Sequence, residues 1–151
     1  MGGLRPGGEG VAVHPEVVAD TGVFSALLEG VRNELSDRYQ GLVAGSLLYI
    51  ATQTLAELRF GAFLRGWGPT RIEAFEKSAA RAVVLPVDDR LVWGLARLRV
   101  DCRRVGHPLH QPIHGGDLWI AASAMVNGLP LVSDDRVFVG VPGLELVTRS
   151  R

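Results

Sequence analysis

The sequence contains a single cysteine and no long apolar run, and these two absences exclude several classes of protein. Cys102 has no second cysteine to pair with, so a disulfide within the chain is impossible. The longest apolar segment, residues 42–51, is interrupted by Gly45 and Ser46 and is shorter than the ~18–20 residues that span a membrane. The amino terminus also lacks the apolar stretch of a signal peptide. We therefore expect a cytoplasmic protein without a membrane segment, in which Cys102 is chemically inert.

Lysine is almost absent, and neither sign of charge dominates. Lys77 is the only lysine, so arginine carries nearly all of the positive charge. The formal net charge is +0, which weakens the case for a protein that binds nucleic acid through overall charge. Arginine pairs bidentately with phosphate or carboxylate, but a base-composition bias of the genome explains the preference for arginine equally well. Nucleic acid therefore stays open as a partner.

The chain divides into a short extension and one domain. Residues 1–15 are rich in glycine and contain little to bury, so we expect a flexible extension there and a folded domain over residues 16–151. From residue 16 onward, short apolar runs alternate with helical patterns, which argues for parallel strands covered by helices on both faces. The predicted fold class is therefore α/β, a three-layer α/β/α domain around a mainly parallel sheet of four to five strands.

The individual elements follow from periodicity and from turn residues. Apolar runs predict strands at residues 17–19, 47–50, 82–85, 131–133 and 144–147. Helical patterns predict helices at residues 23–29, 31–40, 52–64, 70–80 and 117–127, with a long helix after Asp88. We expect Gly41 to end the second helix, Thr52 or Thr54 to cap the third, and Asp88 to cap the long one.

The long helix and the loop after it contain two further patterns. The apolar positions expected to face the core are Leu91, Val92, Leu95, Leu98 and either Val100 or Cys102, and the opposite face carries Arg97, Arg99, Arg103 and Arg104. Residues 106–116 contain His107, His110 and His114 among prolines. These histidines could be metal ligands, but the prolines favour an irregular, exposed loop, with His114 left as a possible substrate contact.

Four acidic residues stand within apolar segments or at their ends: Asp20, Glu57, Asp117 and Asp135. A carboxylate in such a place is unfavourable unless something neutralises it. If the fold gathers the four, a divalent cation is the simplest neutraliser, and oxygen ligands select Mg²⁺ or Mn²⁺ rather than zinc. Asp20 and Asp135 both follow predicted strands, and ligands of parallel sheets bind beyond the carboxyl ends of the strands.

Each acid taken singly has an ordinary structural explanation. Asp20 could be a turn residue or a helix cap, and Asp117 could cap the helix that follows two glycines. Asp135 and its neighbour Asp134 could form a turn. Glu57 lies in mid-helix among residues that face the core, although a solvent-exposed position stays open for it.

The combined pattern resembles the PIN-domain family, and in particular the VapC-type toxins of type II toxin–antitoxin systems. The resemblance extends over about residues 17–147 and rests on four segments, each containing one of the acids: Val17–Thr21, Thr54–Gly61, Asp117–Ala122 and Leu131–Asp135. In the last segment the family pattern is a hydroxyl residue followed two positions later by an acid or amide, which selects Ser133 and Asp135 over Asp134. Gly22 and Ser133 depart from the family's more frequent Ser and Thr.

The resemblance implies a Mg²⁺- or Mn²⁺-dependent endoribonuclease toxin that is neutralised by a VapB-type antitoxin and forms a homodimer. The catalytic residues implied are Asp20, Glu57, Asp117 and Asp135. Metal would be held by Asp20, Asp117 and Asp135, with Glu57 as a further ligand or as the group that positions the attacking water. Thr21 and Ser133 would orient the carboxylates or water.

The sequence leaves a second interpretation open for the partner surface and for the activity. The side chains of Phe60, Phe63, Leu64 and Trp67 could line a groove for an antitoxin helix, or could belong to the core. The main alternative function is a non-catalytic PIN module that binds RNA or protein. A nuclease for DNA flaps is a weaker option because the chain has no insertion for a DNA clamp. An aspartic protease, suggested by Asp20-Thr21-Gly22, is all-β and conflicts with the β/α alternation.

Overall fold

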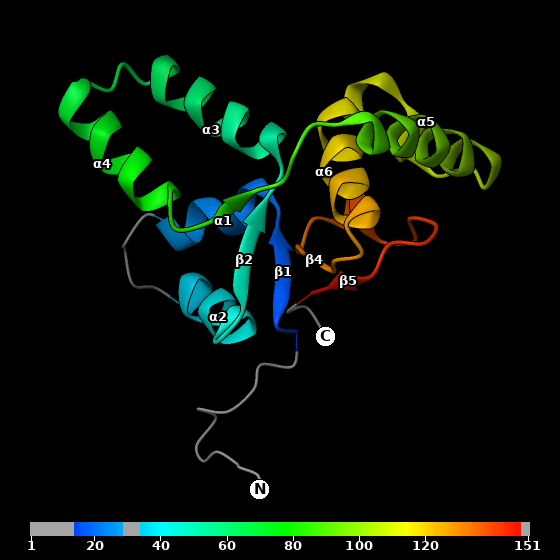
Figure 1. Cartoon of the computed structure of the whole chain (residues 1–151), viewed down its shortest axis with the longest axis horizontal. Coiled ribbons are helices and arrows are strands. Elements are labelled where there is room, and N and C mark those ends of the chain that lie inside the picture. Colours follow the sequence, from blue (N-terminus) through cyan, green and yellow to red (C-terminus); the bar gives the residue numbers. More distant parts are fainter. Residues whose placement is uncertain (1–13, 29–33, 149–151) are drawn as a thin grey trace, which may run out of the picture.

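A parallel sheet lies at the centre of the computed structural model, which describes residues 14–28 and 34–148 (Figure 1). The five strands found there are β1 (Glu16–Ala19), β2 (Leu47–Ile50), β3 (Val83–Val84), β4 (Leu131–Val132) and β5 (Leu146–Val147). They stand in the order β3-β2-β1-β4-β5, and all four pairings are parallel. The predicted fold class is confirmed. The expected extension over residues 1–15 lies almost entirely outside the described residues.

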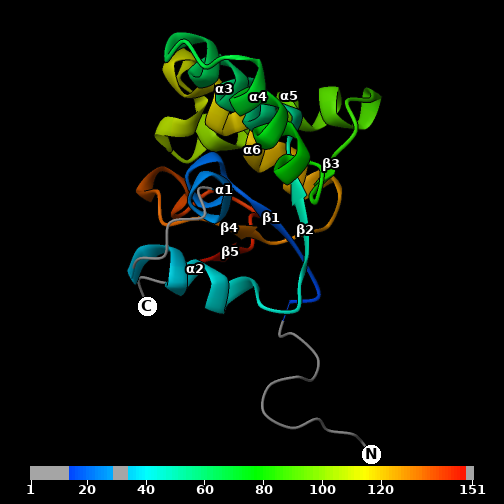
Figure 2. The same ribbon diagram turned by 90° about the vertical axis from the view of Figure 1, so that its left-hand side faces the viewer.

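Helices cover both faces of this sheet. In the described part of the chain the α-helices are α1 (Thr21–Leu28), α2 (Glu34–Val43), α3 (Thr52–Leu64), α4 (Pro69–Ala79), α5 (Asp89–Arg104) and α6 (Gly115–Val126). In Figure 1 α3 and α4 lie on the left of the molecule and α5 on the right, and Figure 2, viewed from the left, shows α3 and α4 close together. Within the described residues, none of the helices combines the length and apolar character needed to cross a membrane.

Alternate residues of β1 pack against different helices. Val18 belongs to the cluster that includes Leu98 of α5 and Ile120 of α6. Val17 belongs to the cluster on the other face, with Phe24 of α1. Beyond the exposed Glu16 both faces of the strand are covered, so Val17, Val18 and Ala19 are all buried, and this explains the continuous apolar run before Asp20.

The pairing of β1 with β4 determines which residues meet at the edge of the sheet. Val18 pairs with Leu131 and Ala19 with Val132. The backbone N–H of Asp20 then donates to the carbonyl of Val132 at 3.2 Å. The next residues on the two strands are therefore neighbours, which brings Asp20 beside the residue that follows β4.

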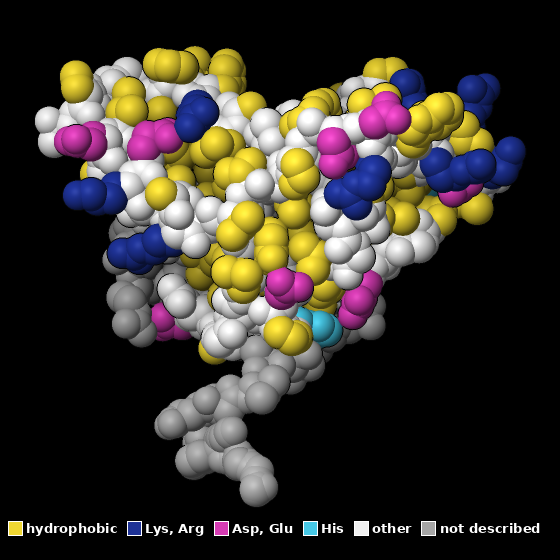
Figure 3. Space-filling view, in the orientation of Figure 1, with side chains coloured by type: hydrophobic (Ala, Val, Ile, Leu, Met, Phe, Trp, Pro, Cys, Tyr) yellow, Lys and Arg dark blue, Asp and Glu magenta, His cyan; other side chains and the backbone are white. Residues whose placement is uncertain are grey.

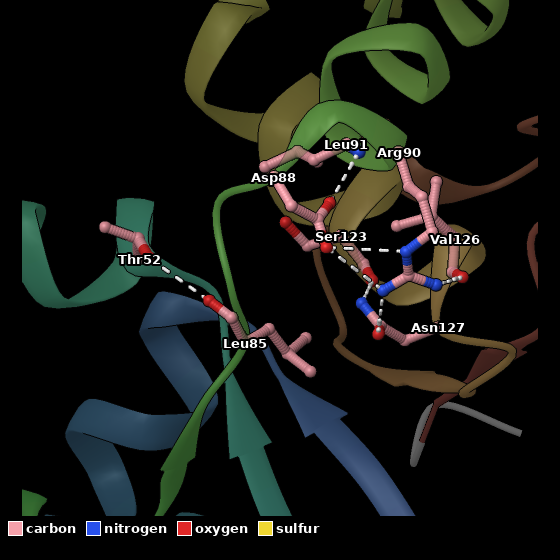
Figure 4. Close-up of polar contacts among 8 residues, drawn as sticks. All are labelled: Thr52, Leu85, Asp88, Arg90, Leu91, Ser123, Val126 and Asn127. Carbon is pink, nitrogen blue, oxygen red and sulfur yellow. Dashed lines mark hydrogen bonds and ion pairs between the residues drawn. The ribbon is translucent and has the colours of Figure 1, made fainter.

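Two predicted helix ends are wrong. α2 continues through Gly41 to Val43 and is followed by Gly45, which adopts a φ of 79°. A glycine inside a helix costs only ~1 kcal/mol relative to alanine, whereas the positive φ at position 45 strongly favours glycine. Neither Thr52 nor Thr54 caps α3, because the N-cap is Ala51 without a side-chain hydrogen bond. The Thr52 hydroxyl instead donates to the carbonyl of Leu85 at 3.3 Å, as Figure 4 shows.

The start of α5 is anchored as predicted and is also joined to the end of α6. Asp88 accepts a hydrogen bond from the backbone N–H of Leu91 at 3.1 Å, which makes it the N-cap. Arg90 donates to the carbonyl of Val126 at 3.1 Å and to the side chain of Asn127 at 3.2 Å (Figure 4). The two helices therefore run antiparallel, with the carboxyl end of α5 near the beginning of α6.

One apolar position assigned to the core face of α5 is wrong, because Val92 is 57% exposed. Of the alternatives Val100 and Cys102, Cys102 is buried and Val100 is 42% exposed. Leu91 and Leu98 are buried as predicted. Burial raises the pKa of the Cys102 thiol and disfavours the reactive thiolate, as expected for an inert cysteine.

The loop before α6 is more regular than expected. Pro108–His110 and Pro112–His114 form short 3₁₀ turns, and α6 begins at Gly115. His107 is half-buried rather than exposed: its Nδ1 accepts from the N–H of Leu109 at 3.1 Å, so its Nε2 donates to the carbonyl of Val139 at 2.9 Å. This histidine therefore connects two segments of the fold and is not available as a metal ligand.

Candidate active site

The four acids lie at the carboxyl edge of the sheet. Asp20 follows β1 directly, Asp135 follows β4, Glu57 lies on α3 and Asp117 on α6. In Figure 1 the arrowheads of β1 and β2 point toward α3 and α6. Burial is the main reason that the pKa values of Asp20 and Asp117 are raised, and neighbouring charges add to it: those of Asp135 and Asp117 for Asp20, and those of Asp135 and Glu57 for Asp117. The fold therefore brings Asp20, Asp117 and Asp135 into electrostatic range of one another, and Glu57 into range of Asp117.

Asp20 is the most buried of the four acids, with 8% of its surface exposed. One carboxylate oxygen accepts from the backbone N–H of Val23 at 2.7 Å, and the other accepts from the hydroxyl of Ser133. The backbone N–H of Asp135 donates to the Ser133 oxygen at 3.0 Å. Burial raises the pKa of the Asp20 carboxyl, the hydrogen bonds from Ser133 and Val23 oppose this, and the neighbouring negative charges add to the increase.

Asp20 caps a helix and at the same time belongs to the group of acids. Its bond to Val23 is that of a helix N-cap, because α1 begins at Thr21. The same carboxylate also accepts a hydrogen bond from Ser133, which ties it to the edge of the sheet where the other acids lie. A single carboxylate therefore begins a helix and connects β1 to the residue after β4.

Asp117 is the third residue of α6, not the cap, which is His114. Burial is the main reason that its pKa is raised. The Nδ1 of His114, 3.4 Å from a carboxylate oxygen, opposes the increase, whereas the charges of Asp135 and Glu57 reinforce it. Its place in the first turn also suits a negative charge, because the helix dipole is positive there.

The two aspartates after β4 have different surroundings. Asp135 is exposed, and one of its oxygens accepts from the N–H of Val137 at 3.0 Å. Asp134 instead accepts a hydrogen bond from the hydroxyl of Thr148, beyond β5. Asp135 is also the residue whose charge acts on Asp20 and Asp117. The structure thus places Asp135 with the other acids.

Glu57 is neither in the core nor free in solvent. The hydroxyl of Thr21 lies 2.5 Å from Oε1, and the side-chain amide of Gln53 donates to Oε2 at 2.9 Å. The Thr21 hydroxyl is also 3.2 Å from that of Thr54. Gln53 and Thr54 were not predicted as site residues. Gln53 could have been found from its spacing, because residues four apart are neighbours on a helix.

The donor chemistry of the site fits a hard divalent cation. The carboxylates supply only oxygen ligands, which suit Mg²⁺ or Mn²⁺. Over residues 14–28 and 34–148, however, no three His, Cys, Asp or Glu side chains form a compact ligand group. Mg²⁺ usually keeps several waters and few direct carboxylate ligands, so acids at this wider spacing remain compatible with it.

A cavity of about 590 Å³ lies between α1, α3 and α4. Leu28, Leu58, Trp67 and Phe75 contribute apolar side chains to it. The guanidinium groups of Arg65 and Arg71 lie 6.0 and 4.3 Å from the centre of a Trp67 ring. Of the four residues expected to line an antitoxin groove, only Trp67 lines this cavity.

The other three residues of that group form a separate apolar surface on α3. Phe60, Phe63 and Leu64 are 66%, 77% and 74% exposed, so the alternative that they belong to the core is wrong. Figure 3 shows hydrophobic side chains gathered along the upper edge of the molecule, over α3. The spacing of these residues, three and four apart, places them on one face of the helix.

Comparison with known proteins agrees with this architecture. Residues 17–144 match the family model of the PIN domain. The chain is 33% identical over 131 residues to ribonuclease VapC5 of Mycobacterium tuberculosis, covering 83% of this chain and 87% of the relative. It is 28% identical over 137 residues to ribonuclease VapC4 of the same organism, covering 87% of this chain and 95% of the relative.

Solved structures show the same relationship. DNA-bound VapBC from Salmonella typhimurium aligns with a TM-score of 0.71 and 25% identity over 88% of this chain and 97% of that one. VapBC-5 from Mycobacterium tuberculosis aligns with a TM-score of 0.60 and 27% identity over 89% and 97%. The chain therefore belongs to the PIN-domain family and, within it, to the VapC-type proteins.

Proposed function

We propose that this protein is an endoribonuclease that depends on Mg²⁺ or Mn²⁺ and acts as the toxin of a toxin–antitoxin pair. The observation that carries the proposal is the gathering of Asp20, Glu57, Asp117 and Asp135 at one edge of the sheet, where the charges of neighbouring acids help to raise two of their pKa values. The related proteins VapC4 and VapC5 are ribonucleases, which supports RNA as the substrate.

Asp20, Asp117 and Asp135 would hold the metal directly or through water. When bound, a divalent cation polarises a phosphoryl oxygen and acidifies a water molecule. Ser133 and the backbone N–H of Val23 hold the Asp20 carboxylate in one orientation. Thr21 does the same for Glu57, whose carboxylate would orient an attacking water or accept its proton.

Cleavage of RNA by the parent protein, with and without Mn²⁺, tests this proposal. We expect cleavage only with metal, and its loss in Asp20→Ala and Asp117→Ala. Asp89→Asn is a suitable control, because Asp89 is an exposed acid on α5. Millimolar Mn²⁺ should also raise the melting temperature of the parent, because a metal that binds only the folded state stabilises it. Equal cleavage by the parent and both alanine variants would reject the proposal.

A VapB-type antitoxin is the proposed partner of the cavity between α1, α3 and α4. Several of the structural neighbours are VapBC complexes, which supports a partner of this kind. The cavity offers apolar side chains, and Arg65 and Arg71 beside Trp67 add positive charge. It therefore suits an apolar antitoxin segment that carries acidic residues next to its anchor.

A homodimer is the proposed assembly, with the exposed face of α3 as its contact. Phe60, Phe63 and Leu64 form an apolar surface of the kind that marks an interface. Phe63→Arg should shift the protein toward a monomer in sedimentation experiments, and Val105→Arg, at an exposed valine beyond α5, is the control. A monomeric parent protein would contradict the assembly without affecting the enzymatic proposal.

The second candidate function is a non-catalytic PIN module that binds RNA or protein. The observation that favours it is the lack of a compact metal-ligand group among the described residues. Binding of RNA without turnover over a full range of Mg²⁺ and Mn²⁺ concentrations would support this function over the enzymatic one.

A further inference from the structure

Two side chains hold the Glu57 carboxylate in a single orientation. Thr21 lies 2.5 Å from Oε1 and the Gln53 amide donates to Oε2 at 2.9 Å, so each oxygen has its own partner. A carboxylate oxygen has lone pairs to spare after one hydrogen bond. Glu57 therefore keeps acceptor capacity toward the site while its position is fixed from both sides.

Gly116 provides the space in which Glu57 and Gln53 meet. A Cβ placed at Gly116 would lie 2.8 Å from Oε2 of Glu57 and 3.0 Å from Nε2 of Gln53. Both distances are too short for ordinary contact, so a side chain there would displace the carboxylate and the amide. A Cβ at the neighbouring Gly115 would have nothing within 4 Å apart from the adjacent residues and the backbone of its own helix.

The helix itself does not explain a glycine at this position. Gly116 is the second residue of α6, where alanine would form a more stable helix. Positive φ values occur at Gly45, Gly66 and four later glycines, but not at Gly116. Position 116 therefore does not need a glycine for its backbone conformation. The remaining physical reason for a glycine there is the close approach of the Glu57 carboxylate.

We propose that Gln53 and Gly116 are positioning residues for Glu57. The side-chain amide of Gln53 holds one oxygen of the Glu57 carboxylate. Gly116, which has no side chain, leaves room for Glu57 and Gln53 next to Asp117. This inference rests on the proposed RNA-cleaving function. Displacement of a reacting group by about 1 Å can reduce a rate on the order of a hundredfold, so the placement of Glu57 has a measurable consequence.

Gly116→Ala and Gly115→Ala form a matched pair for the test. We expect Gly116→Ala to lower kcat for RNA cleavage by about tenfold to a hundredfold, with KM unchanged. Its melting temperature should not fall, because alanine favours the helix. Gly115→Ala gains the same helix preference without touching Glu57, and its kcat should stay within about twofold of the parent. Equal kcat values for the two variants would overturn the inference.

Gln53→Met tests the amide separately, because methionine keeps the length of the side chain but cannot donate. Its kcat should fall while KM and the melting temperature stay close to those of the parent. Gln40→Met, at an exposed glutamine of α2, is the control. In a Glu57→Ala background, Gly116→Ala should change kcat by less than about twofold, because no carboxylate remains to be displaced. An independent further loss there would contradict the assignment.

A parent protein that cleaves no RNA with any divalent metal would refute the proposed function, not the positioning. Crystal structures of the parent and Gly116→Ala then decide the positioning alone. A carboxylate of Glu57 shifted away from residue 116, with the Gln53 hydrogen bond lost, supports it. An unmoved carboxylate overturns it.

Discussion

The α5–α6 pair and the α3–α4 pair flank the same group of acids but bury their apolar side chains to different extents. α6 buries six of its residues, and α5 packs Leu91, Leu98 and Cys102 inward. α3 buries only Thr54 and Ala62, and Phe63 is 77% exposed. In Figure 3 several basic side chains gather on the α5 side, with apolar ones between them, and apolar side chains lie over α3.

This difference separates a deeply packed part of the fold from one that buries few of its side chains, although α5 also exposes Val92, Trp93 and Val100. α5 and α6 pack against the sheet in one core, which holds Asp117 on a well-packed helix. The α3–α4 pair carries Glu57 on a helix whose outer face and neighbouring cavity remain available for contact. Regulation by a partner is therefore expected on the α3–α4 side, close to one acid of the site.

The largest expected effect compares the acids contributed by the two sides. Asp117→Asn should lower kcat/KM for RNA cleavage by about 10³-fold or more, because it removes charge from the proposed metal site. Glu57→Gln should lower it by about tenfold to a hundredfold, because an amide keeps the shape but not the basicity. Steady-state cleavage with saturating Mn²⁺ measures both. Equal losses would show that the two helices contribute alike to the chemistry.

Core packing should make truncations on α5 and α3 differ in their effect on the free energy of unfolding. Leu98→Ala removes a buried side chain from α5 and should lower the free energy of unfolding by about 2–5 kcal/mol. Phe63→Ala truncates a larger but exposed side chain on α3 and should change it by less than about 0.5 kcal/mol in the monomer. Urea unfolding followed by circular dichroism compares them. A large loss for Phe63→Ala would mean that α3 is stabilised by its outer face.

Two tryptophans compare the sides as partner surfaces. Trp67 lines the cavity next to α4, and Trp93 is 71% exposed on α5. Trp67→Ala should weaken binding of the proposed VapB-type antitoxin by about 2 kcal/mol, as expected for an aromatic anchor at an interface. Trp93→Ala should leave the affinity unchanged. Isothermal titration calorimetry gives both values, and the reverse pattern would move the interface to α5.

The acids also predict how stability depends on pH without metal. The pKa values of Asp20 and Asp117 are raised above 3.8 by burial and by neighbouring charges, so the folded state holds protons that the unfolded state has lost. Their contribution to stability therefore falls as the pH rises from 3.8 through the raised pKa values. Asp117→Asn removes one of the charges that repel one another, so without metal it should raise the free energy of unfolding at neutral pH. The increase should be less than about 1 kcal/mol, since the side chain is partly screened by solvent.

Thermal melts of the parent and Asp117→Asn at pH 5 and pH 7 measure this effect. Saturating Mn²⁺ should remove the advantage of the variant, because the cation neutralises the same charges. A variant less stable than the parent at neutral pH without metal would contradict the repulsion between carboxylates that the proposed metal would relieve.

The smallest expected effect is the ion pair that joins α3 to α4. Arg59 donates two hydrogen bonds to Glu76, at 3.0 and 2.7 Å, but the pair is exposed. A double-mutant cycle with Arg59→Gln and Glu76→Gln should give a coupling free energy below about 1 kcal/mol that decreases with salt. A larger, salt-independent value would mean that this pair, not apolar contact, holds the two helices together.

The alternation of strands and helices and the N-cap Asp88 could be predicted from local information, namely periodicity and turn chemistry. The choice of Asp135 over Asp134 came from the resemblance to the PIN-domain family, and its role in the site stays a prediction. Errors occurred where two local explanations compete. Gly41 is acceptable both inside and after a helix, and Val92 fits the apolar period of α5 but is 57% exposed.

Only the tertiary structure decided which side chains touch across the site. Ser133 bonds Asp20 across 113 positions of sequence, and Thr21 meets Glu57 across 36. The exposure of Phe60 and the space at Gly116 likewise depend on what packs nearby, which no periodicity encodes. The sequence alone determined the secondary structure and the chemical types at the edge of the sheet, because backbone preference and hydrophobic pattern are local. Distances, burial and the raised pKa values required the packed fold, because they depend on neighbours from remote parts of the chain.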